Sequence, residues 1–283
     1  MKLLDMTSAR TGLALTVRHA RLALLAGGVY ALAYALEAVT AARLSAAEGP
    51  LWHWLLAMLA GFVAVIPAAA AFVRLGLGQG ARLSLGQDER RLLGVMALIW
   101  VLLFTVLGTA GLALMFMITA LAVINVDVTA QPPAGPVDIF ALFGTGEWIV
   151  AIVIMAAFAG FSLWFAARLA FSLPSTVDSA RIRVLSIWPA SSGRWVEIGL
   201  TLLAAAAPGL VILIAWNAAA ASLTGIWPGL PYQGAEGEAA PLALIAGLGA
   251  LHGLLKIALA AAPACAALGA LYVKYQSDSP LEA

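Results

Sequence analysis

Two ionisable side chains stand four residues apart inside a long apolar stretch of this sequence. His252 and Lys256 would share one face of a helix, because residues four apart are neighbours on a helix surface. Glu37 is a third ionisable residue in an apolar stretch. An ammonium, an imidazole and a carboxylate that line one polar cavity can bind an anionic group or hold a proton. Lys256, His252 and Glu37 therefore form a candidate site.

The same residues also have a purely structural interpretation. Lys256 can neutralise Glu37 across a helix interface, or it can lose its proton, because burial disfavours the charged form. Glu197 lies near the start of another apolar stretch, where Arg168 or Arg194 can serve as its ion-pair partner. The sequence leaves the functional and the structural interpretation of these residues open.

Motifs of metal, cofactor and catalytic sites are missing. His19, His53 and His252 fall at different depths of the apolar stretches, so they do not offer paired haem ligands. The sequence contains no phosphate-binding glycine loop, no H-E-x-x-H and no G-x-S-x-G. Cys265 is the single cysteine, which rules out a disulfide within one chain. We expect no catalytic residues, no metal and no cofactor.

Composition indicates which solvent surrounds the chain. Hydrophobic residues make up 63% of the 283 residues, charged residues make up 10%, and the mean hydropathy is +1.00. Soluble domains carry charges at about a quarter of their positions. Lipid must therefore contact most of the surface, and the sequence predicts an integral membrane protein.

Six stretches are long enough to cross a bilayer, since about 20 apolar residues in a helix span a hydrocarbon core of about 30 Å. They cover residues 22–42, 51–73, 92–124, 148–173, 195–223 and 242–273. We expect a single all-α domain, a polytopic bundle of six transmembrane helices. Residues 1–21 are expected to form an amphipathic lead-in on the membrane surface, and residues 274–283 a tail. Gly249 and Gly253 form a small-xxx-small pair, which predicts close approach of another helix.

The distribution of Lys and Arg predicts the orientation. Almost all of the 15 basic residues precede the first stretch, follow the sixth, or lie in the connections between stretches two and three and between four and five. Positive residues are retained on the cytoplasmic side of short loops. We therefore expect both termini in the cytoplasm.

An internal repeat is a further hypothesis. Arg82-Leu83-Ser84 and Arg183-Val184-Leu185-Ser186 occupy matching positions in the two basic connections, and Arg74 and Arg168 end the stretches before them. Three helical hairpins related by an axis along the membrane normal would produce this pattern.

Part of the second basic connection resembles a known family. Arg168, Leu173-Pro174, Ser186, Trp188, Gly193 and Trp195 are similar to a pattern in YciC-like bacterial membrane proteins, and in the membrane domain found with glycerophosphodiester phosphodiesterases. The resemblance covers about 30 residues and departs at Pro189, which interrupts the short inner helix of the pattern. It implies an inner-membrane protein of unassigned activity.

Two functions fit these observations. One is a non-catalytic accessory or scaffold component of a membrane assembly. The other is a small transporter with its site at Lys256, His252 and Glu37. Membrane lipids and other membrane proteins are the expected partners, and nothing in the sequence points to a nucleic acid.

Overall fold

The computed structural model describes residues 3–124, 143–229 and 240–278. Throughout these ranges the regular structure is helical, without strands, and six spans are long and apolar enough to cross a membrane. The predicted all-α bundle with six apolar helices is confirmed. The first five spans are α2 (Ala20–Ser45), α3 (Leu51–Gly76), α4 (Gln87–Ile124), α5 (Thr145–Ala170) and α7 (Trp195–Thr224). The sixth consists of α8 (Leu242–Leu255), the π-helix η3 (Lys256–Ala261) and α9 (Ala262–Asp278).

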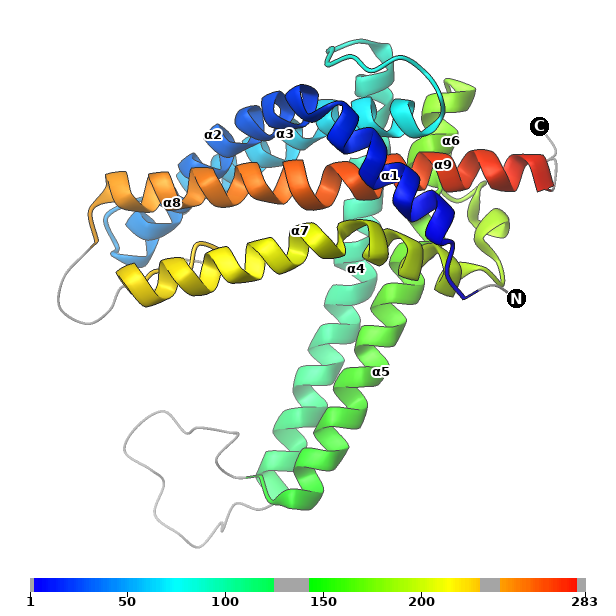
Figure 1. Cartoon of the computed structure of the whole chain (residues 1–283). Coiled ribbons are helices and arrows are strands. Elements are labelled where there is room, and N and C mark those ends of the chain that lie inside the picture. The colour runs from blue at the N-terminus through cyan, green and yellow to red at the C-terminus, as the bar shows by residue number, and fades with distance from the viewer. Residues whose placement is uncertain (1–2, 125–142, 230–239, 279–283) are drawn as a thin grey trace, which may run out of the picture.

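The sixth span is the central element of the fold. Helices α1 (Met6–Arg18), α2, α3 and α7 all pack against some part of it. In Figure 1 it runs across the molecule in orange and red, with α2 and α3 on one side and α7 on the other. It continues as helix to Asp278, so the predicted tail begins later than residue 274.

Glycines allow these helices to touch the sixth span backbone to backbone. A Cβ atom at Gly12 of α1 would collide with the carbonyl of Pro263, and one at Gly76 of α3 with the carbonyl of Ala266. On α8, a Cβ at Gly253 would lie 2.9 Å from Cβ of Tyr34, and one at Gly249 would lie 3.0 Å from Cβ of Ala38. The predicted packing role of Gly249 and Gly253 is thus confirmed. Lipid tails are as apolar as leucine, so van der Waals contact at such crossings holds membrane helices together.

Pro263 coincides with the irregular part of the sixth span. Because proline lacks an N–H, Pro263 leaves the carbonyl of Leu259 without its usual helical donor. The π-helix η3 contains Leu259, and its carbonyl faces Gly209 of α7, where a Cβ would collide with it. The wider π-turn and the missing side chain of Gly209 together let the two backbones meet.

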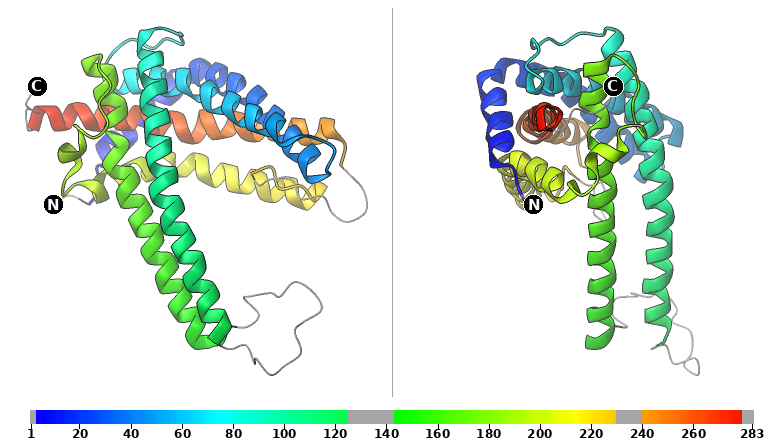
Figure 2. Two further views of the ribbon diagram at one scale, coloured as in Figure 1. Left: turned by 180° about the vertical axis from the view of Figure 1, so that it is seen from behind. Right: turned by 90° about the vertical axis from the view of Figure 1, so that its right-hand side faces the viewer.

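The hairpin of α4 and α5 diverges from the other four spans (Figure 2). Only 11% of the most apolar window of each of these two spans is buried, against 33% or more in the others. The hairpin contacts the rest of the bundle at its inner end. We define the inner end as the end of the molecule that carries α1, α6 (Ser172–Ser179) and the 3-10 helix η2 (Trp188–Ser191). The three hairpins therefore pack differently, and the three-hairpin repeat stays a prediction.

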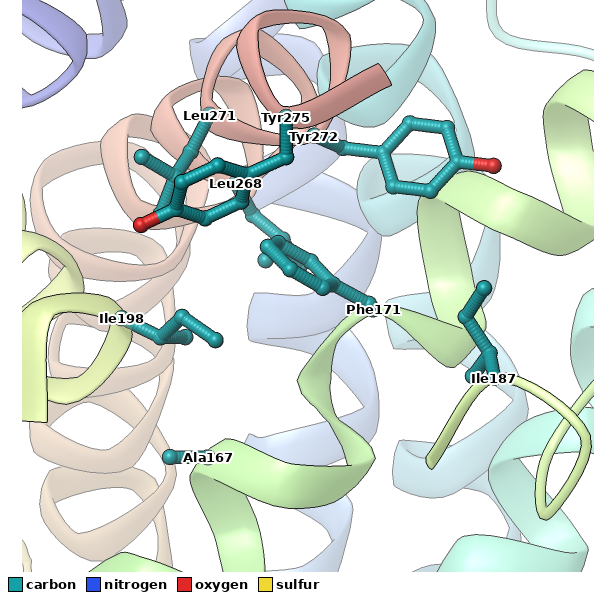
Figure 3. Packing of buried hydrophobic residues seen from close by; sticks show 8 residues of the cluster. All are labelled: Ala167, Phe171, Ile187, Ile198, Leu268, Leu271, Tyr272 and Tyr275. Atoms are coloured by element: carbon teal, nitrogen blue, oxygen red, sulfur yellow. The ribbon is translucent and has the colours of Figure 1, made fainter. Parts of the chain in front are cut away.

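A hydrophobic cluster joins the inner ends of α5, α7 and α9. Phe171 is fully buried and contacts the rings of Tyr272 and Tyr275 edge-on, with ring centroids 5.7 and 5.4 Å apart. Figure 3 shows Phe171 lying beneath these two rings, with Ile198 and Ile187 on either side. This cluster anchors the base of the α4–α5 hairpin to the bundle.

The N-terminal helix α1 (Met6–Arg18) is docked on the inner end. It buries the small residues Ser8, Ala9, Gly12 and Thr16 against α9 and α7. Residues 6–18 of the expected lead-in are helical, and their interface with the bundle is built from small residues, while Leu3 and Val17 are exposed. Sequence inspection did not predict this contact.

Asp5 connects α1 to two spans. Its backbone N–H donates to Oγ1 of Thr201 in α7 at 3.0 Å, and its carboxylate accepts a hydrogen bond from Nζ of Lys274 in α9 at 2.7 Å. Burial disfavours the carboxylate, but hydrogen bonds from Lys274 and Ser8 and the charge of Lys274 outweigh this effect and hold the pKa of Asp5 below its ordinary value of 3.8.

The crossing of α7 and η3 can be tested with Gly209→Val. The added side chain meets the backbone of Leu259, which cannot rotate away as a flexible side chain could, so we expect a loss of about 1–3 kcal/mol or more. Thermal unfolding in detergent measures it. Gly247→Val is the matched control, because a Cβ at Gly247 has no neighbour within 4 Å. If Gly209→Val and Gly247→Val were equally stable, the close backbone contact between α7 and η3 would be contradicted.

We expect the docking of α1 on the bundle to weaken at acidic pH. Because the pKa of Asp5 is lower in the folded protein, its contribution is present at neutral pH and is lost as the pH falls through the folded-state value. Asp5→Asn should lower hydrogen-exchange protection of residues 6–18 at neutral pH, and should remove the further loss seen in the wild type below about pH 4. Asp178→Asn is the control, since Asp178 is exposed and accepts a hydrogen bond from Gln276 of α9 at 3.0 Å. If Asp5→Asn left the hydrogen-exchange protection of residues 6–18 unchanged, Asp5 would not be the residue that holds α1 on the bundle.

Candidate functional site

His252 is buried between α8 and α7. Its Nδ1 lies 3.1 Å from Oδ1 of Asn217, and the backbone N–H of Gly229 donates to the same oxygen at 3.1 Å. Because an amide oxygen can only accept, the contact with His252 is a hydrogen bond in the tautomer that carries the proton on Nδ1. Asn217 thereby ties α8 to α7 and to the turn that follows α7.

Tyr34 of α2 also contacts His252 and the turn after α7. Its ring stacks on the His252 ring with centroids 5.2 Å apart, and its hydroxyl donates to the carbonyl of Pro228 at 3.2 Å. Tyr34 and Tyr30, one turn apart, present their rings to Nζ of Lys256, at 5.6 and 5.8 Å from the ring centroids. A cation at this distance from an aromatic face is attracted by the ring quadrupole.

Lys256 has no ion-pair partner or hydrogen-bond acceptor among the residues that the structure describes. It lies about 21 Å along the helix axis from Leu242, the first residue of α8. Its ammonium is therefore deep in a span whose surroundings are apolar. A cation at mid-bilayer costs about 2.5–3.5 kcal/mol even on the lenient insertion scale, and the two tyrosine rings offset part of that cost.

Lys256 and His252 line the same cleft between α7 and the sixth span. Its volume is about 580 Å³, and the rest of the lining includes Leu213 and Asn217 of α7 and Ala264 of α9. Sites for small molecules have volumes of about 300–1,000 Å³. The structure thus brings two of the three candidate residues together on one open cleft.

Glu37 lies in a neighbouring pocket and forms no ion pair with Lys256. This pocket, of about 140 Å³, is also lined by Trp54 of α3 and by Gly249 of α8. The two cavities share Trp227 and Gly229, and the stacked Tyr34 and His252 rings lie between the two charges. Glu37 and Lys256 therefore face separate compartments, although each still feels the charge of the other.

The predicted ion pair at the inner boundary is not formed. Glu197 is buried in the first turn of α7, where a carboxylate is favoured by the helix dipole, and it takes part in none of the ion pairs among the described residues. The guanidinium of Arg168 lies over Trp188, 4.7 Å from the ring centroid, and that of Arg194 lies 4.4 Å from the centroid of Tyr275. Aromatic rings are thus the neighbours of both arginines.

A charge network at the start of α4 was missed from the sequence. Arg74 is buried and pairs with Glu89 at 2.6 Å and with Asp88 at 3.3 Å. Glu89 also accepts hydrogen bonds from Oγ of Ser84 and from the backbone N–H of Gly86, both at 2.8 Å. Two acidic residues in the first turn of an apolar helix, following a lone arginine, were the available signal.

Asn217, Tyr30 and Tyr34 were also missed. Asn217 is the one amide side chain in the apolar stretch 195–223, and the two tyrosines stand four apart in stretch 22–42. Both features were visible in the sequence. The sequence does not show which helices pack together, and it is this packing that brings Asn217, Tyr30 and Tyr34 to His252 and Lys256.

Metal binding has no support in the described part of the chain, where no three His, Cys, Asp or Glu side chains gather closely enough to hold an ion. Cys265 is partly buried in α9, packed with apolar residues of the core. Comparison with protein-family models, with curated proteins and with solved structures finds no match to this chain.

Proposed function

We propose that this membrane protein is a small transporter that takes an anionic ligand at Lys256. The observation that carries the proposal is Lys256 itself: the residue is exposed within a membrane span, its side chain helps to line a cleft of about 580 Å³, and it has no carboxylate partner among the described residues. An uncompensated charge within the bilayer is costly, so a structural lysine would either pair with a neighbouring acid or lose its proton. An anionic ligand supplies that compensation.

The thin barrier between the two cavities supports transport. Tyr34 and His252 separate the cleft from the Glu37 pocket, and the bonds that hold them come from Asn217 and from the turn after α7. The two pockets already share Trp227 and Gly229 in their linings. Pro67, Pro208 and Pro263 interrupt helical hydrogen bonding in three of the spans, and the π-helix starts at Lys256 itself. Discontinuous helices at a central site are typical of transporters.

The proposed location is the bacterial inner membrane with both termini in the cytoplasm. The basic connections between α3 and α4 and between α5 and α7 lie at the same end of the molecule as α1 and the end of α9 (Figure 1). Basic residues gathered at one end support an orientation with that end inside. The proposed kinship with YciC-like proteins is compatible with this location and adds no activity.

Cysteine labelling tests transport without a known substrate. Ala264→Cys, in a Cys265→Ala background, places a thiol on the cleft wall. In vesicles we expect an anionic methanethiosulfonate to modify it faster than a cationic one, because Lys256 attracts the anion, and we expect Lys256→Met to remove this preference. Val211→Cys is the control: Val211 is 65% exposed on α7 outside the cleft, where lipid should exclude both reagents. A thiol at residue 264 that neither reagent reaches from either side would refute transport.

A second candidate function, an accessory role in a membrane assembly, is favoured by the α4–α5 hairpin. Large apolar side chains such as Phe104 and Phe116 of α4 are 67% and 75% exposed, along helices that diverge from the bundle. Another membrane protein could pack against them, since helices in membranes associate by close side-chain contact.

Photo-crosslinking separates this second function from the first. With p-benzoylphenylalanine at residue 116, an accessory role predicts a protein adduct of defined mass in native membranes, at least about tenfold stronger than with the same probe at the bundle position 211. Adducts with lipid alone at both positions would contradict the accessory role.

A further inference from the structure

The cleft beside Lys256 has an apolar wall and a single cation. Leu210, Leu213 and Ile214 of α7 form one side, and Ala260, Ala261 and Ala264 of the sixth span form the other. The polar groups are confined to the end where Lys256, His252 and Asn217 lie. A small, fully hydrated anion would leave this apolar wall in contact with water, which is unfavourable.

The cleft is continuous with the lipid-facing surface of the bundle. Ile214 on its wall is 64% exposed and Leu210 is 37% exposed, so the rim lies among side chains that face the surroundings. In the rear view of Figure 2, the α4–α5 hairpin crosses the bundle at the inner end and then leads away from α7. The lining of the cleft comes from α7, the turn after it and the sixth span, and no residue of another described helix belongs to it.

We propose that the cleft binds a single-chain amphiphilic carboxylate, such as a long-chain fatty acid, which enters sideways from the bilayer. The carboxylate contacts Nζ of Lys256, and the alkyl chain lies along Leu213, Ile214 and Ala264. This inference rests on the proposed function, because it names the substrate class of the same site.

Charge and size both favour this ligand. One unpaired ammonium neutralises one negative charge, which fits a monoanion, and the cation lies too deep for water to solvate it well. The volume of about 580 Å³ is within the range of about 300–1,000 Å³ that buries one small molecule, which suits one alkyl chain more than the two chains of a phospholipid. The apolar lining supplies the affinity for the chain, and Lys256 supplies the selectivity for the acid.

Native mass spectrometry of the purified full chain in a neutral detergent tests the proposal. The probes are palmitate, hexadecanol as the uncharged molecule of equal chain length, and phosphatidylglycerol as the two-chain anion. We expect one palmitate per chain, and at least about tenfold weaker binding of hexadecanol and of phosphatidylglycerol. Equal binding of hexadecanol would refute the role of the charge, and preferred binding of phosphatidylglycerol would refute the single-chain ligand.

Two variants locate the binding site. Lys256→Met should weaken palmitate binding by about tenfold or more, whereas Arg43→Met, which removes a cation outside the cleft, should not. Ala264→Phe keeps the charge but fills the cleft, so it should also weaken binding, and Val211→Phe on the lipid-facing side of α7 is its control. Unchanged palmitate binding by monodisperse Ala264→Phe would overturn the proposal even if Lys256→Met failed to fold.

The outcomes for the ligand and for transport can be told apart. If the thiol introduced by Ala264→Cys is labelled with the expected charge preference but palmitate does not bind, transport stands and the amphiphilic substrate is refuted. If palmitate binds in a Lys256-dependent manner but that introduced thiol stays unreactive from both sides, the binding site stands and a water-accessible transport path is refuted.

Discussion

Backbone contact along the sixth span is the constraint on which the rest of the structure depends. In lipid the hydrophobic effect does not draw helices together, so they associate through van der Waals contact over surfaces that match closely. Gly12, Gly76, Gly209 and Gly253 each lie where a Cβ would press into the sixth span or its neighbour. The small side chains of the crossings thus determine which helices pack around this span.

This close packing also explains where polar groups are found. Pro263 leaves the carbonyl of Leu259 without its usual donor, and this carbonyl is accommodated because Gly209 leaves room beside it. The π-helix that begins at Lys256 contains Leu259, and residues on both sides of this crossing line the cleft of about 580 Å³. The irregular part of the sixth span and the candidate site therefore occupy the same stretch of helix.

The inner end uses a different kind of interaction. There Arg74 pairs with Glu89, Asp5 accepts hydrogen bonds from Lys274, and Arg168 and Arg194 lie over aromatic rings. These groups lie close to the membrane boundary if the basic end is cytoplasmic, so water or polar headgroups can share their solvation. Lys256 lies far from either end of the sixth span and is exposed there without an ion-pair partner among the described residues, and that contrast separates a structural charge from a candidate binding group.

The sequence alone determined the class of the protein and its spans, because crossing a bilayer imposes length and composition on each segment independently of the others. Each of the six predicted stretches corresponds to a helical span, and the paired glycines of α8 indicated close packing. Which helices meet was decided only by the tertiary structure. His252 and Lys256 were recognisable as neighbours because they are four apart on one helix, whereas Asn217 and Tyr34 reach them from other helices. The expected partners Glu37 and Glu197 were chosen for their charge, but the packing of α2 and α7 directs them elsewhere, since local sequence carries no record of how helices rotate about their axes.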